Sequence, residues 1–135
     1  MRAFSLGLFI LLTQNAWACG YCVEDKIAST YDHAVVTRAL AQKHHVVFFH
    51  IDGSVPAGDA ARRVLEGLVR STAGVDPGTA RLSIDTATVS FAFDPARTSL
   101  ASVQARIEKK LAPQKLSLMA LRIMEEPADL KTVKR

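Results

Sequence analysis

Apolar residues recur along the chain at two different spacings, which predict where helices and strands lie. Helical spacing, with apolar positions three or four residues apart, marks the segments 23–42, 59–74 and 98–112. Strand-like stretches rich in β-branched and aromatic residues are 44–52, 80–85, 88–93 and 116–124. The pattern therefore predicts a mixed α+β protein.

The order of these elements predicts the fold. From residue 44 to residue 126 it is strand, helix, strand, strand, helix, strand, which is typical of a ferredoxin-like βαββαβ sandwich. In that fold both helices cover one face of a four-stranded antiparallel sheet. The segment 23–42 is then an extra N-terminal helix, and its apolar stripe (Ile27, Tyr31, Ala34, Val35) predicts that it covers the other face or an edge strand. "VVFFHI" lacks alternation, as expected of a strand covered on both faces.

The first eighteen residues have the features of a secretory signal peptide. Arg2 supplies a positive charge, "AFSLGLFILL" an apolar run, and Ala16-Trp17-Ala18 a small-x-small cleavage site. The run is about half of the ~20 residues that a spanning helix needs. We therefore expect cleavage after Ala18 and export to the periplasm, with a lipid anchor on Cys19 as the alternative and the only membrane attachment expected.

Length and charge point to one small domain. The chain has 135 residues and a formal net charge of +4. Its basic residues come in scattered pairs without interleaved aromatic residues, which argues against a nucleic-acid partner. We divide the chain into a signal peptide (1–18), a Cys-x-x-Cys segment with its helix (19–43), a ferredoxin-like domain (44–126) and a basic tail (127–135) that we expect to be mobile.

The stretch "TATVSFAFDPARTSLASVQARIEKKL", residues 86–111, resembles the second half of a heavy-metal-associated domain. The resemblance implies a ferredoxin-like fold, a metal ion as ligand and a membrane metal transporter or another periplasmic protein as partner. That family binds its metal through Cys-x-x-Cys between the first strand and the first helix. Here that loop, "DGSVPAGDAARR", has no cysteine, histidine or methionine, so no ligand carries over to it.

Metal chemistry must instead come from "CGYC", which contains both cysteines of the chain, Cys19 and Cys22. Two thiols at this spacing can converge on one ion, and a helix N-terminus favours their thiolate forms. After cleavage the α-amine of Cys19 would add a nitrogen, which makes a soft ligand set suited to Cu(I) or Zn(II).

Other functions of this motif stay open. "CGYC" also resembles the redox motif of periplasmic disulfide isomerases, in which Cys19 would attack and Cys22 would resolve. In an oxidising compartment the pair can instead form a simple structural disulfide in a binding module that holds no metal. The sequence shows no nucleophile-elbow serine, zinc-protease helix or phosphate loop. We therefore expect a non-enzymatic carrier or sensor of a soft metal.

Histidines supply further candidate ligands. His33 is expected on the surface of the first helix, and His50 on the same strand face as Val46 and Phe48. His44 and His45 should point to opposite faces, so only one of them could join His50. We keep His33 and His50 as additional candidate ligands beside the two cysteines.

Overall fold

The computed structural model describes residues 22–132. Its helices are α1 (Val23–Thr30), α2 (His33–Ala41), α3 (Asp59–Arg70) and α4 (Leu100–Leu111), with the short 3-10 helices η1 (Ala112–Gln114) and η2 (Pro127–Thr132). Its strands are β1 (His45–Asp52), β2 (Arg81–Ser83), β3 (Thr88–Phe93) and β4 (Ser117–Met124). The expected signal peptide and Cys19 lie outside the described residues, so cleavage and lipid attachment stay predictions.

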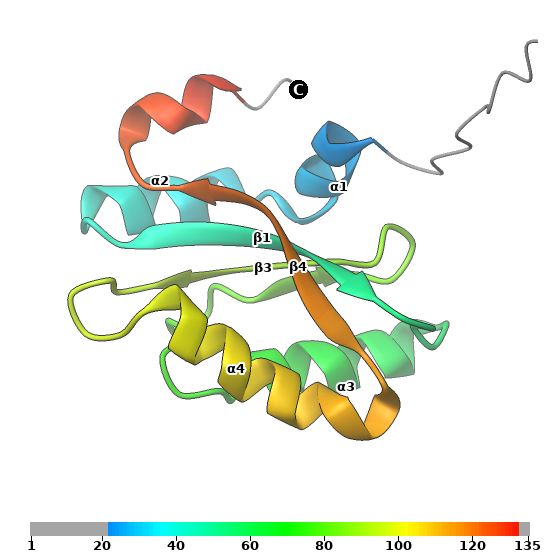
Figure 1. Ribbon diagram of the computed structural model, residues 1–135. Helices are drawn as coiled ribbons and strands as arrows, with labels where there is room; N and C mark the ends of the chain where they lie inside the picture. The colour runs from blue at the N-terminus through cyan, green and yellow to red at the C-terminus, as the bar shows by residue number, and fades with distance from the viewer. Residues whose placement is uncertain (1–21, 133–135) are drawn as a thin grey trace, which may run out of the picture.

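The four strands form one antiparallel sheet in the order β2-β3-β1-β4. β1 lies inside the sheet, between β3 and β4, and β2 pairs with β3 as a hairpin. α3 connects β1 to β2, and α4 connects β3 to β4. This connectivity confirms the predicted ferredoxin-like βαββαβ fold (Figure 1).

One face of the sheet packs on α3 and α4. Alternate residues of β1, namely Val47, Phe49 and Ile51, point into this layer. The helices contribute buried apolar residues at helical spacing: Leu65 and Val69 from α3, and Val103, Ile107 and Leu111 from α4. Ser99 caps α4 by accepting a hydrogen bond from the backbone of Ser102 at 3.2 Å.

The other face packs on the N-terminal helices, as predicted for the extra segment. Val46 and Phe48 of β1 lie there with Ile27 of α1 and Leu40 of α2. Figure 1 shows the resulting three layers, with α1 and α2 on one side of the sheet and α3 and α4 on the other. Because both faces are covered, four consecutive residues of β1 are buried, which explains its missing alternation.

The single helix predicted over 23–42 is wrong, because the chain breaks between α1 and α2. Tyr31 has extended backbone angles, and Asp32 caps α2 by accepting a hydrogen bond from Val35 N at 3.2 Å. An aspartate that bonds its own backbone competes with a continuous helix. The buried stripe of α2 is consequently Val36, Ala39 and Leu40, and the predicted positions Ala34 and Val35 are exposed or half-buried.

The end of the chain also differs from expectation. Residues 127–132 form η2 instead of starting a mobile tail, and Leu130 packs against the core beneath α1 and α2. Asp129 holds this turn by accepting hydrogen bonds from the backbone of Glu125 at 2.8 Å and Glu126 at 3.0 Å. These two bonds, that to Glu126 first, lower the pKa of Asp129.

Candidate functional site

Cys22 stands immediately before α1 as its N-terminal capping residue. Its carbonyl accepts a helical hydrogen bond from Lys26 N at 3.1 Å, and its thiol donates to Oδ2 of Asp25 at 3.1 Å. The cysteine is free and exposed. The structure therefore places one sulfur of the predicted pair at a helix N-terminus, open to solvent, while Cys19 lies outside the described residues.

α1 crosses the sheet and contacts its strands one after another. The contacts along the chain are Glu24 with Arg122 of β4, Lys26 with His50 of β1, Thr30 with Ser90 of β3, and Asp32, after the helix, with Arg81 of β2. Neighbouring strands lie about 4.8 Å apart, so the path from the first strand to the fourth is roughly 14 Å long. Cys22 is consequently held near the β4 edge of the sheet.

His50 shares a face with Val46 and Phe48, as predicted, but its ring already has a partner. Lys26 Nζ lies 3.2 Å from His50 Nδ1 and donates to the carbonyl of Thr86 at 2.6 Å. Because an ammonium group has only donors, Nδ1 accepts in this contact. His50 thus helps to hold α1 against the sheet. It does so through Lys26, which lies about one helical turn after Cys22.

His33 lies at the other end of this path. Its Nδ1 is 3.0 Å from the hydroxyl of Tyr31, and its Nε2 is 3.5 Å from that of Thr37. Nearly the width of the sheet separates it from Cys22. Within residues 22–132 no group of three or more histidine, cysteine, aspartate or glutamate side chains could hold a metal ion. The structure therefore does not bring Cys22, His33 and His50 together as one ligand set.

A polar cluster that the sequence did not reveal surrounds His44. Its Nδ1 lies 2.5 Å from Oδ2 of Asp76, and its Nε2 lies 3.7 Å from Oδ2 of Asp94. A hollow of about 360 Å³ opens beside them, with Arg97 and Arg106 in its wall. Asp76 and Asp94 each begin a turn, the first before β2 and the second after β3, and no sequence pattern indicated that they would meet one histidine. The cluster ties the start of β1 to these two turns.

His45, in contrast, lies on the opposite face of β1 from His50. Its ring meets Phe93 edge-on with 5.6 Å between ring centroids. Neither His44 nor His45 is therefore seen to join His50. Of the sequence-based candidates, Cys22 combines a metal-binding atom with exposure to solvent and a defined place in the fold.

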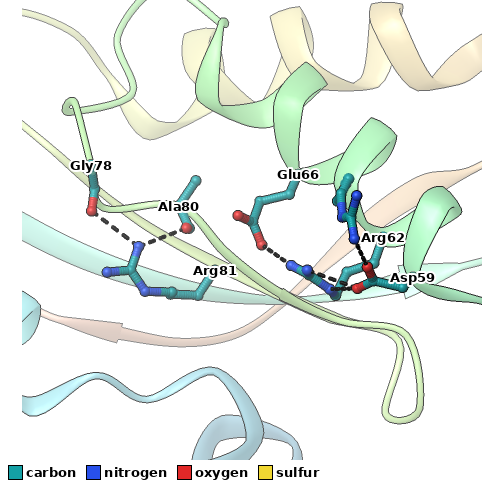
Figure 2. Close-up of polar contacts among 7 residues, drawn as sticks. Asp59, Arg62, Glu66, Gly78, Ala80 and Arg81 are labelled. Carbon is teal, nitrogen blue, oxygen red and sulfur yellow. Dashed lines mark hydrogen bonds and ion pairs between the residues drawn. The ribbon is translucent and has the colours of Figure 1, made fainter.

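A second hollow, of about 580 Å³, lies beside β2 and is lined by Arg62, Glu66 and Arg81 among others. Figure 2 shows that these cations already have partners. Arg62 donates to Asp59 at 3.0 Å and to Glu66 at 3.1 Å, and Arg81 donates to the carbonyls of residues 78 and 80. These contacts are local, within α3 and within the turn before β2. The hydrogen bond from Arg62, followed by that from Arg63, lowers the pKa of Asp59.

The loop that binds metal in heavy-metal-associated domains corresponds here to residues 53–58, between β1 and α3. Gly53 has φ of +113°, and a Cβ at this position would lie 2.7 Å from the carbonyl oxygen of Lys115. The loop thus packs its backbone tightly against the turn before β4. It contains no cysteine, histidine or methionine.

Comparison with solved structures finds several chains that are similar to part of this one. Oxidized MerP from Ralstonia metallidurans CH34 is 15% identical over 58% of this chain and 99% of its own, with a TM-score of 0.45. A copper binding domain from HMA7, a P-type ATPase, is 15% identical over 58% of this chain and 96% of its own, with a TM-score of 0.46.

The N-terminal domain of a potential copper-translocating P-type ATPase from Bacillus subtilis, in the Cu(I)-loaded state, is 17% identical. It covers 62% of this chain and 94% of its own, with a TM-score of 0.45. The element order and the strand order β2-β3-β1-β4 of this chain are those of the ferredoxin-like fold expected from the sequence.

No model of a protein family matches the sequence, and no curated protein matches it. Among the described helices none has the length and apolar character to cross a membrane.

Proposed function

We propose that this chain is an exported carrier of a soft metal ion, Cu(I) or alternatively Zn(II), which Cys19 and Cys22 bind together. The observation that carries the proposal is the position of Cys22, whose exposed thiol stands at the N-terminus of a helix fixed to the sheet. Cys19 precedes it by three residues, the spacing at which two sulfurs can share one ion. The ion is cargo, and no reaction is assigned to the chain.

Thiolate sulfur is the ligand that Cu(I) prefers, and Zn(II) accepts it as well. Binding replaces the Cys22 Sγ proton, which now points to Asp25. The ion pair between Glu24 and Arg122 holds the first turn of α1 against β4, so Cys22 keeps a defined place.

Export and delivery complete the proposal. Residues 1–18 would be removed on export, which frees the α-amine of Cys19 as a third ligand atom. A membrane metal transporter or another periplasmic protein would then receive the ion from the exposed site. The intact mass of protein recovered from the periplasm tests this step, because it should match a chain that begins at Cys19; a lipid-sized addition would instead mean that Cys19 is acylated.

Metal stoichiometry tests the site itself. Purified protein, reduced and then freed of reductant, is titrated with Cu(I) and separately with Zn(II) against a coloured competing chelator. We expect one ion per chain, lost in both Cys19→Ser and Cys22→Ser. His33→Ala is the matched control, because His33 lies across the sheet, and it should bind as the unmodified protein does.

The same samples distinguish the redox alternative. Protein that binds neither ion, and whose mass is lower by about two daltons until reductant restores it, would contradict the metal proposal and support a thiol–disulfide pair. Binding that survives the replacement of both cysteines would contradict the assignment of the site to them.

A further inference from the structure

β4 leaves one side of its backbone unpaired. The strand pairs with β1, and the described part of the chain places no strand on its other side. Alternate N–H and C=O groups of an edge strand point away from the sheet and can pair with another strand. β4 is eight residues long, whereas β2, at the opposite edge, has three. The β4 edge is therefore the one that can accept a strand.

The side chains along β4 are apolar where an edge strand is usually protected by charge. Met119 and Ile123 are 55% and 39% exposed, and Ala120 between them is also exposed. Arg122 is the charged residue within the strand, and it forms an ion pair with Glu24. Gln104 of α4 donates to the carbonyl of Leu118 at 3.2 Å, near the start of the strand. The stretch beyond it presents apolar side chains beside an unpaired backbone.

The charges that flank β4 have opposite signs at its two ends. Lys115 precedes the strand, Glu125 and Glu126 follow it, and all three are exposed. When two copies of one strand pair antiparallel about a two-fold axis, the start of each lies beside the end of the other. The edge is thus complementary in charge to a second copy of itself.

The pairing pattern of β4 specifies where the two-fold axis lies. Phe49 of β1 pairs with Ala120, and the preceding Phe48 pairs with Arg122. Leu121 is therefore the extra residue of a β-bulge and has no partner residue in β1. When Ala120 faces Ala120 of the second copy, Lys115 faces Glu126. In this arrangement Arg122 faces Met119, so the two arginines do not oppose each other.

We propose that β4 pairs with β4 of a second copy of this chain, antiparallel and centred on Ala120, to make one continuous eight-stranded sheet. The three layers of each copy then continue into those of the other, because a two-fold axis normal to the sheet keeps α1 on the same face in both. This inference does not depend on metal binding.

A cysteine placed on the axis tests the register. Ala120→Cys is made in a protein whose Cys19 and Cys22 are serine, and the dimer is trapped by mild oxidation. Directly opposed residues have Cβ atoms about 4.5 to 5.5 Å apart, close enough for a disulfide after small adjustment. We expect covalent dimer from Ala120→Cys and little from the matched control Ser117→Cys, which would face Met124. Equal trapping of the two variants would overturn the pairing.

Charge reversal tests the same arrangement without a covalent bond. Lys115→Glu creates repulsion at two symmetry-related places, so the dissociation constant measured by sedimentation should rise about tenfold, which is 1.4 kcal/mol. Adding Glu125→Lys and Glu126→Lys to it should restore the dimer. A dimer insensitive to these changes would overturn the register. A chain that stays monomeric at about 100 μM would overturn the proposal and leave the β4 edge to a strand of another protein.

Discussion

Glu24 in α1 and Arg122 in β4 form an ion pair between residues that stand 98 positions apart in the chain, with Arg122 Nη1 3.2 Å from Glu24 Oε2. The pair joins the turn that carries Cys22 to an edge strand of the sheet. The hydrogen bond to Glu24 raises the pKa of the Arg122 guanidinium further above its already high value. The position of the proposed metal site therefore depends on a contact between the two ends of the described chain.

Removing this pair should increase local opening of α1 but change the free energy of unfolding of the protein only slightly. Glu24 is 43% exposed, so Glu24→Ala should lower the free energy of unfolding by no more than about 1 kcal/mol. Amide hydrogen exchange in the first turn of α1 should nevertheless accelerate, because its tie to β4 is lost. Glu125→Ala is the control and should leave exchange in α1 unchanged; equal effects of the two variants would contradict the role of the ion pair.

Asp32 should make stability depend on pH in the acid range. Its pKa is lowered first by the hydrogen bond from Val35 N and further by Arg81. Since the folded pKa is the lower one, the stabilisation is complete above the unfolded value of about 3.9 and is lost as pH falls through the folded value.

Asp32→Asn tests this dependence, because asparagine keeps the helix cap but does not titrate. Below about pH 4 the unmodified protein should lose unfolding free energy more steeply than Asp32→Asn, as measured by urea denaturation. At neutral pH Asp32→Ala should cost about 1 kcal/mol through the lost cap. Parallel pH profiles of the unmodified protein and Asp32→Asn would contradict the assignment.

The N-terminal layer should contribute to the stability of the whole domain. Ile27 is fully buried against the sheet, so Ile27→Ala should lower the free energy of unfolding by about 3 kcal/mol. Val23, in the same helix, is 44% exposed, and Val23→Ala should change it by less than about 0.5 kcal/mol. If Ile27→Ala proved as mild as Val23→Ala in chemical denaturation, α1 would not be packed on the sheet.

Two glycines of the β1–α3 loop offer a matched test of its packing. Gly53 and Gly58 both have positive φ, which costs alanine about 1 to 3 kcal/mol. A Cβ at Gly53 would also collide with the carbonyl of Lys115, whereas at Gly58 it would meet nothing within 4 Å. Gly53→Ala should therefore lower the melting temperature clearly more than Gly58→Ala, and equal shifts would show that the loop does not pack as described.

Local patterns predicted the elements of the domain because each element meets its neighbours through a regular face. The helix α4 lies within the segment 98–112, and β2 and β3 lie within the segments 80–85 and 88–93, as the spacing of apolar residues predicts. The unbroken apolar run of β1 likewise indicated burial on two faces.

The structural features that the sequence did not predict depend on contacts between segments far apart in the chain. The break before α2 was missed because Asp32, in a helical pattern, bonds both its own helix and Arg81 far along the chain. The apolar spacing of α3 also favours burial of Val64, but this side chain is 57% exposed because the helix turns Leu65 and Val69 toward the sheet. The contacts of His44 and His50 likewise join turns and helices that no local pattern pairs.

The path of α1 across all four strands also constrains the order of folding. β1 pairs with β3 and β4, which both follow it in the chain, so the surface on which α1 rests is incomplete until β4 has formed. Contacts that span most of a chain form late, because closing the intervening loop costs entropy before the contact repays it. We therefore expect α1, the first helix of the described residues, to dock on the sheet last, so that the thiol of Cys22 reaches its final place only when the sheet is whole.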